Sequence, residues 1–166
     1  MKEFLEGRRI GFALRPQLGS IALGLAIAVS LLDLMAWFGW GARDTNGFVI
    51  ANAWLAAATA VAALLAAVTA FAESTDAAPE DRQLGRLDML AAVVVFVLYA
   101  ISAGLRTTDL GAAGASPGAV VAAFAGLVVL IVDGVIAATL YSSREWEVPD
   151  EEEYEPRRHQ KRRRAV

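Results

Sequence analysis

The chain contains no cysteine and a single histidine, His159, among its 166 residues. Without cysteine it has no disulfides, thiolate zinc sites, cysteine-ligated iron–sulfur clusters or cysteine nucleophiles. One histidine in a basic tail supplies neither a paired-histidine haem site nor a histidine-based triad. No nucleophile–base pair, metal triad or phosphate-binding loop is recognisable either. We therefore expect no catalytic residue, no metal site and no cofactor.

Charged residues are also scarce: they make up 20% of the chain, whereas 57% is hydrophobic. A soluble domain of this length is usually about a quarter charged. Much of the charge lies near the two ends of the chain. The apolar residues therefore exceed what a globular core would need.

Four long runs hold this apolar excess, at about residues 19–40, 48–72, 87–105 and 119–141. Each is long enough for the ~20 residues that cross the ~30 Å hydrocarbon core of a bilayer as a helix. The runs are continuously apolar and rich in alanine and leucine, whereas barrel strands alternate apolar and polar residues. With short connections between the runs, the sequence predicts an all-α polytopic membrane protein, a four-transmembrane-helix up-down bundle.

The regions outside this domain (residues 19–142) differ from it in composition. Residues 1–18 mix apolar and basic side chains, which fits a cytoplasmic arm lying as an interfacial helix on anionic lipid. Residues 143–166 form an acidic and then a basic block, and we expect this tail to be disordered. The basic block is expected to contact lipid or a partner, or to fold back onto the acidic block; with no aromatic or other recognition element beside it, no nucleic-acid partner is expected. Its residues are Arg157, Arg158, Lys161, Arg162, Arg163 and Arg164.

The distribution of lysine and arginine predicts the orientation. Thirteen of these residues lie in the N-terminal arm, the second connection and the C-terminal tail, against two, Arg43 and Arg106, in the other connections. Cytoplasmic segments carry the excess of Lys and Arg in multi-pass proteins. We therefore expect a cytoplasmic-membrane protein with both termini in the cytoplasm.

Three acidic residues fall inside or beside the apolar runs. Asp33 and Asp133 lie within the first and fourth runs, and Asp88 lies at the start of the third. An intramembrane carboxylate is costly, and such residues are functional candidates by default. No Lys, Arg or His appears inside the runs, so Asp33 and Asp133 are expected to be protonated, hydrogen-bonded across helices or in contact with water.

Two interpretations of these acids stay open. Asp33 and Asp133 lie at different depths and resemble two steps of a proton path, or they bridge helices through neighbouring polar side chains. Asp88 is expected to be a solvated acid or an acid at the N-terminal end of its helix that interacts with the helix dipole. The bridging partners would be Ser30, Asn52, Thr59, Ser102 or Thr139.

Small residues form faces on two of the runs. The second run is rich in alanine, and the fourth has Gly118, Ala122 and Gly126 at four-residue spacing. Such faces let helices approach closely in lipid. They serve either the packing of the monomer or contact with a partner subunit.

Several short motifs also resemble those of a known family. Arg15-Pro16 precedes the first run, which contains Leu31-Leu32-Asp33-Leu34; Leu87-Asp88 begins the third run, and Ala137-Ala138-Thr139-Leu140-Tyr141 ends the fourth. They resemble, in this order, the His-Pro, Leu-Leu-x-Asp-Leu, Leu-His and Gly-Gly-x-Leu-x-Tyr motifs of a prokaryotic family of four-helix membrane proteins, a domain of unknown function. The similarity covers about residues 15 to 146.

The resemblance implies a four-helix membrane fold and, because relatives occur beside redox modules, an electron-transfer setting. This chain departs from the family at the two histidines that could bind haem or metal, which are replaced by Arg15 and Asp88. It therefore lacks the ligands that such a setting would require.

Two functions are compatible with these patterns. The first is a non-catalytic subunit, scaffold or assembly partner, with membrane lipids and a second copy or other membrane subunits as partners. The second is a small proton- or ion-linked transporter or conductor that uses the intramembrane acids. A membrane enzyme has the least support.

Overall fold

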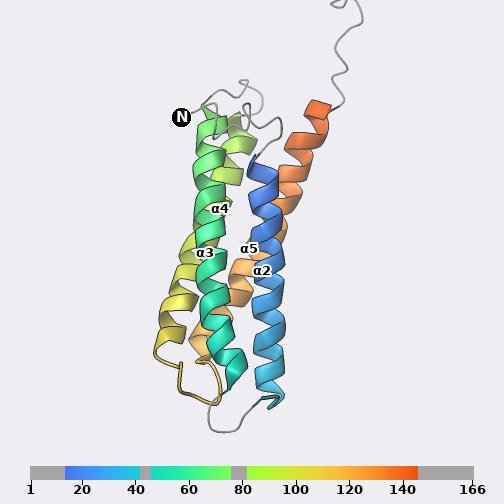
Figure 1. Cartoon of the computed structure of the whole chain (residues 1–166). Helices are drawn as coiled ribbons and strands as arrows, with labels where there is room; N and C mark the ends of the chain where they lie inside the picture. The colour runs from blue at the N-terminus through green and yellow to red at the C-terminus, as the bar shows by residue number, and fades with distance from the viewer. Residues whose placement is uncertain (1–13, 42–45, 76–81, 146–166) are drawn as a thin grey trace, which may run out of the picture.

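The chain forms a four-helix bundle, seen in a computed structural model that describes residues 14–41, 46–75 and 82–145, with side chains up to residue 139. Figure 1 shows four long helices side by side, each running opposite to the one before it. Each helix packs against its two neighbours around the bundle, so α2 and α4 lie diagonally across it. The all-α up-down architecture that the apolar runs predict is confirmed. The helices are α2 (Leu14–Trp37), α3 (Gly47–Ser74), α4 (Arg82–Thr107) and α5 (Pro117–Glu145).

The boundaries of α2 differ from those expected. The helix begins at Leu14 rather than near residue 19, so the arm predicted over residues 1–18 overlaps it. It ends at Trp37 because Gly39 has a positive φ of 74° and closes a Schellman motif, in which the amide of Trp40 donates to the carbonyl of Met35. Residues 1–13 and 146–166, which include most of the predicted arm and the charged tail, lie outside the described residues.

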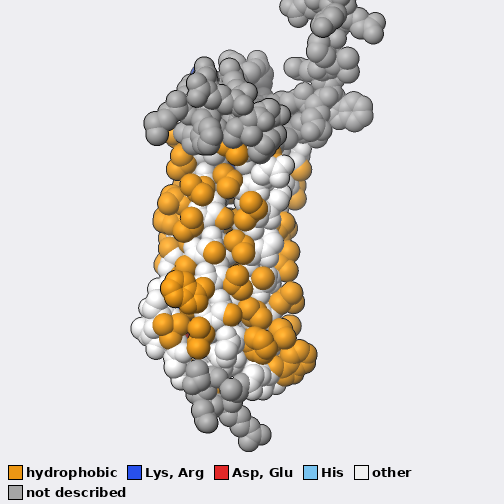
Figure 2. Space-filling model, in the orientation of Figure 1, with side chains coloured by type: hydrophobic (Ala, Val, Ile, Leu, Met, Phe, Trp, Pro, Cys, Tyr) orange, Lys and Arg blue, Asp and Glu red, His pale blue; other side chains and the backbone are white. Residues whose placement is uncertain are grey.

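All four helices are long and apolar enough to cross a membrane, with candidate spans of 24, 28, 26 and 23 residues. Large apolar side chains point outward along the whole bundle, and Figure 2 shows hydrophobic side chains distributed over the length of the described face. Trp54, for example, is 73% exposed. An apolar surface of this extent is a liability in water but is what lipid requires. The four helices therefore indicate a multi-pass membrane protein.

The centre of the bundle is made of small residues instead. Most of the buried apolar residues are alanines, many of them on α3. On α5, a Cβ added to Gly126 would lie 2.6 Å from a ring carbon of Tyr99, so glycine is what lets this ring pack against the α5 backbone. Because lipid gives no hydrophobic drive for helix association, such close approach and its dispersion energy have to hold the bundle together. The alanines of α3 and Gly126 on α5 thus serve packing within the monomer, whereas Gly118 is exposed.

Candidate functional site: two buried ion clusters

The first cluster lies at the end of the bundle where α2 and α4 begin, and we call it the Arg15 cluster (Arg15, Asp88 and Asp133). The guanidinium of Arg15 donates from Nε and Nη2 to the two oxygens of Asp88, at 3.0 and 2.8 Å. Nη2 also donates to Oδ2 of Asp133 at 2.7 Å. Arg15 is 1% exposed, and the three side chains come from α2, α4 and α5. One guanidinium therefore holds two carboxylates from two other helices.

The second cluster lies at the opposite end of the bundle, and we call it the Arg106 cluster (Asp33, Asn52, Ser102 and Arg106). Arg106 binds Asp33 in a bidentate manner, with Nη1 donating to Oδ1 at 2.7 Å and Nη2 to Oδ2 at 2.5 Å. Asn52 donates to Oδ1 of Asp33 at 2.7 Å, and Nε of Arg106 donates to the hydroxyl of Ser102 at 3.2 Å. Arg106 is completely buried. A bidentate arginine–carboxylate pair is among the strongest hydrogen-bonded arrangements available to side chains.

Both clusters link α2 to α4 across the diagonal of the bundle. At one end α2 supplies the arginine and α4 the aspartate, and at the other end the roles are reversed. Arg15 on α2 meets Asp88 on α4, whereas Asp33 on α2 meets Arg106 on α4. On each helix the two charged residues are 18 positions apart, which is five full turns at 3.6 residues per turn. They consequently share one helix face and lie about 27 Å apart along the axis. Two helices that are not neighbours in the bundle are thus joined at both ends by ion pairs.

The prediction that no basic side chain neutralises Asp33 and Asp133 is wrong. Arg15 and Arg106 lie inside the described helices and bind these acids directly. Both arginines stand close to the ends of the apolar runs, where sequence inspection assigns them to the flanking arm and connection. The hydrogen bond from Asn52 to Asp33 is one of the bridging contacts that the sequence suggested.

The expectation that Asp88 is a solvated acid at a helix end is also wrong. Asp88 lies six residues after the start of α4, is 3% exposed and accepts two hydrogen bonds from Arg15. A buried carboxylate needs such compensation because its desolvation is costly. Arg15 and Asp88, the two positions singled out by the family resemblance, are therefore in direct contact in this bundle.

The two clusters differ in charge balance. The Arg106 cluster has one guanidinium and one carboxylate. The Arg15 cluster has one guanidinium and two carboxylates, and Oδ1 of Asp133 is buried with no hydrogen-bond partner in the part of the chain that is described. When both acids are ionised, the Arg15 cluster carries one uncompensated negative charge, which a proton or another cation would neutralise.

An apolar region separates the clusters. The core between them is built mainly from alanine and valine, such as Ala26 and Val95. The hydroxyls of Thr59 and Thr69 donate to carbonyls of their own helix. The hydroxyl of Ser30 does the same. The phenol oxygen of Tyr99 has no hydrogen-bond partner among the described residues. Asp33 and Asp133 therefore belong to two separate sites rather than to a continuous chain of hydrogen bonds.

Among residues 14–41, 46–75 and 82–139, no group of three or more His, Cys, Asp or Glu side chains is placed to hold a metal ion. The basic residues of the tail, for which contact with lipid or a partner was predicted, lie outside the described residues. Comparison of the chain with protein-family models, curated proteins and solved structures gives no match. The resemblance to the four-helix membrane family thus stays a prediction, and the function has to be inferred from the geometry.

Proposed function

We propose that this protein is a non-catalytic integral membrane subunit, scaffold or assembly partner of a prokaryotic cytoplasmic membrane. The observation that carries the proposal is the use of the intramembrane charges: both acids that were candidates for proton transfer are bound to arginines that cross-link α2, α4 and α5. Charges used in this way fix the positions of helices relative to one another. A rigid bundle with an outward apolar face is suited to holding a partner in the membrane.

Site-specific photocrosslinking in cells tests the scaffold proposal. A photoreactive phenylalanine analogue would replace, one at a time, residues with outward-facing side chains on different helices. A scaffold is expected to give one discrete protein adduct whose yield depends on the helix face that carries the probe. If every position labels only lipid, the proposal is wrong. Suitable positions, each more than half exposed, are Leu31, Trp54, Val121 and Val135 on three of the helices and Ile101, 49% exposed, on α4.

The proposed orientation places both termini in the cytoplasm. Burial of Arg15 and Arg106 removes them from the count of loop charges, which leaves Arg43 as the one basic residue in the two connections proposed to lie outside. On the opposite side, three basic residues remain in the arm, two (Arg82 and Arg86) lie at the start of α4, and seven lie in the end of α5 and the tail. This stronger asymmetry supports the positive-inside assignment.

Reporter fusions test the orientation. Fusions after Arg43 or after Asp109 are expected to be active on the outside, and fusions after Arg82 or at Val166 in the cytoplasm. The measurement pairs a reporter that is active only outside with one that is active only in the cytoplasm. An external C-terminus would show that the charge count does not determine the topology.

A proton- or ion-linked transporter is the second candidate, and the uncompensated carboxylate of the Arg15 cluster is the observation that favours it. We expect no proton flux, because an apolar core separates this cluster from the Arg106 cluster. Liposomes holding the wild type under an imposed pH gradient would be compared with liposomes holding Asp133→Asn, which keeps the Arg15–Asp88 pair intact. Flux through the wild type that the variant loses would establish the transporter instead.

A further inference from the structure

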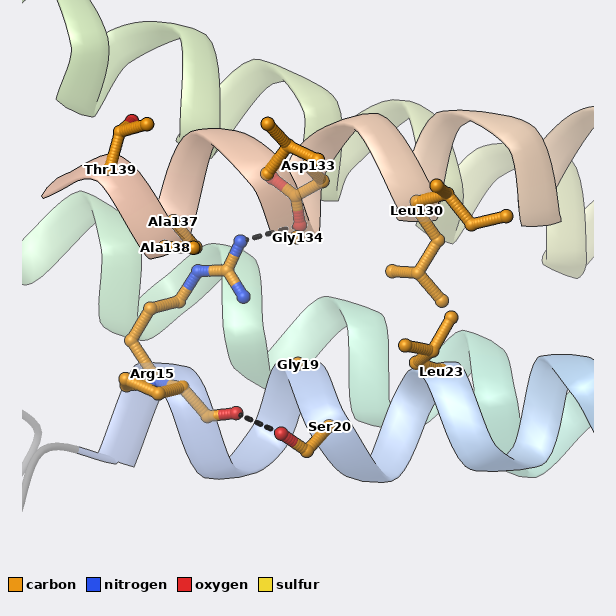
Figure 3. A pocket seen from close by; sticks show the side chains of 13 residues that line it. Arg15, Gly19, Ser20, Leu23, Leu130, Asp133, Gly134, Ala137, Ala138 and Thr139 are labelled. Atoms are coloured by element: carbon orange, nitrogen blue, oxygen red, sulfur yellow. Dashed lines mark hydrogen bonds and ion pairs between the residues drawn. The ribbon is translucent and has the colours of Figure 1, made fainter. Parts of the chain in front are cut away.

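A cavity of about 720 Å³ lies between α2 and α5, beside the Arg15 cluster (Figure 3). All the residues that line it come from these two helices, which pack against each other less extensively than the other neighbouring pairs. Small residues in the walls, including Gly19, Gly134 and Ala138, leave the space open. The volume falls within the ~300–1,000 Å³ typical of small-molecule sites.

The walls of the cavity are apolar along most of their length and charged at one place. Leu23, Leu130 and Ile131 form part of the apolar wall, and Arg15 and Asp133 provide the charged part. Figure 3 shows the guanidinium of Arg15 extending from α2 toward Asp133 on α5, at the side of the space. The cavity therefore joins an apolar compartment to a buried ion cluster, and a ligand that fills it needs both an apolar body and a charge.

The sign of that charge follows from the cluster. Two of the three donor nitrogens of Arg15, Nε and Nη2, already donate to carboxylates. Oδ1 of Asp133 is buried behind the cavity wall and has no hydrogen-bond partner among the described residues, so its charge is not compensated by a donor there. When both carboxylates are ionised they outweigh the single guanidinium, so the local field attracts one positive charge and repels an anionic headgroup. In an apolar surrounding this Coulomb interaction is much stronger than in water.

An organic cation fits better than a metal ion or a proton. A metal ion needs several oxygen ligands close together, and the described residues contain no such group. A proton would balance the charge but leave the apolar space unfilled. The cavity lies between two membrane-spanning helices, so a lipophilic molecule can reach it sideways from the bilayer.

We propose that the cavity between α2 and α5 is a binding site for a lipophilic monocation that enters from the bilayer and neutralises the Arg15 cluster through Asp133. The site does not depend on the scaffold function, because a structural subunit also binds a ligand of this kind. If no cation binds, the binding site is refuted and the scaffold proposal still stands. If no protein crosslink forms, the scaffold proposal is refuted and the binding site still stands.

Two probe ions of the same shape and opposite charge test the site. The full-length protein in detergent is titrated with radiolabelled tetraphenylphosphonium and, separately, with tetraphenylborate, and binding is measured by equilibrium dialysis. Tetraphenylphosphonium is expected to bind saturably with one site per chain and at least tenfold more tightly than tetraphenylborate. Equal binding of the two ions, or no saturable binding of the cation, overturns the proposal.

Two variants localise the binding. Asp133→Asn keeps the Arg15–Asp88 pair and is expected to weaken tetraphenylphosphonium binding at least tenfold. Gly134→Leu places a side chain at a lining position where an added Cβ meets no atom within 4 Å, so it takes up cavity volume and removes none of the three charged side chains. It is expected to reduce binding of the cation to a similar extent.

Gly104→Leu is the matched control, because Gly104 also has open space around an added Cβ but does not line the cavity. This variant is expected to bind tetraphenylphosphonium like the wild type, and thermal unfolding of all variants is recorded in parallel. Unchanged binding in Gly134→Leu would place the cation elsewhere and refute the assignment, whether or not Asp133→Asn folds.

Discussion

Replacing Arg15 by glutamine is expected to lower the free energy of unfolding by about 3–5 kcal/mol, the cost typical of removing one partner from a buried ion pair. The substitution leaves Asp88 and Asp133 buried beside each other with no cation between them. Their mutual repulsion adds to the desolvation cost of each, so the effect should be the largest of any single substitution at the two clusters. Unfolding of the purified protein in detergent measures it.

Two companion variants identify charge as the cause. Arg15→Lys keeps the positive charge but loses the two parallel bonds to Asp88, so an intermediate loss of stability is expected. The triple variant with Arg15→Gln, Asp88→Asn and Asp133→Asn contains no charge in the cluster and should recover a large part of the loss. If the triple variant is no more stable than Arg15→Gln alone, packing of the arginine side chain rather than charge balance holds this end of the bundle together.

The sequence predicts the four helices well because the physical requirement behind them is local. A run that crosses a bilayer needs about 20 apolar residues, and a run of this length is recognised from its own residues alone. The alanine-rich face of α3 can be predicted from the sequence for the same reason, since close helix packing in lipid needs small side chains. The end of α2 at Trp37 is harder to predict from the sequence. It depends on a glycine with positive φ, and glycines are also frequent inside the helices.

The ion clusters could not be predicted in the same way, because they depend on contacts between residues 73 positions apart. Counting loop charges treats an arginine at the edge of an apolar run as part of a connection, and this is how Arg15 and Arg106 are overlooked. One signal was present: an arginine and an aspartate stand 18 residues apart on both α2 and α4, in opposite order. A spacing of five whole turns puts the two charged residues of each helix on one face. Because α2 and α4 run in the same direction and carry the two residues in opposite order, an arginine meets an aspartate at both ends.

Substitutions in the Arg106 cluster are expected to give the second large loss of stability. The losses at Asp33 and Arg106 should not be additive. Asp33→Asn leaves the guanidinium of Arg106 completely buried without a carboxylate, and Arg106→Gln leaves Asp33 with Asn52 as its remaining side-chain donor among the described residues. Each single substitution is expected to cost about 3–5 kcal/mol of unfolding free energy. The double variant removes both charges and should cost much less than the two singles added together, because neither charge remains unpaired.

Asp133→Asn is the matched comparison, since it removes an intramembrane carboxylate of the same type from a cluster that keeps a balanced pair. It is expected to change stability by less than about 1 kcal/mol, as weak interhelical contacts in membranes do. Asp33→Asn is therefore expected to lose much more stability than Asp133→Asn, although the two acids are almost equally buried, at 6% and 2% exposure. Equal losses in both variants, or additive losses in the Asp33 and Arg106 double variant, would show that burial rather than charge pairing determines what each aspartate contributes. The predicted difference arises because one aspartate is the sole carboxylate for its arginine, whereas the other is the second of two.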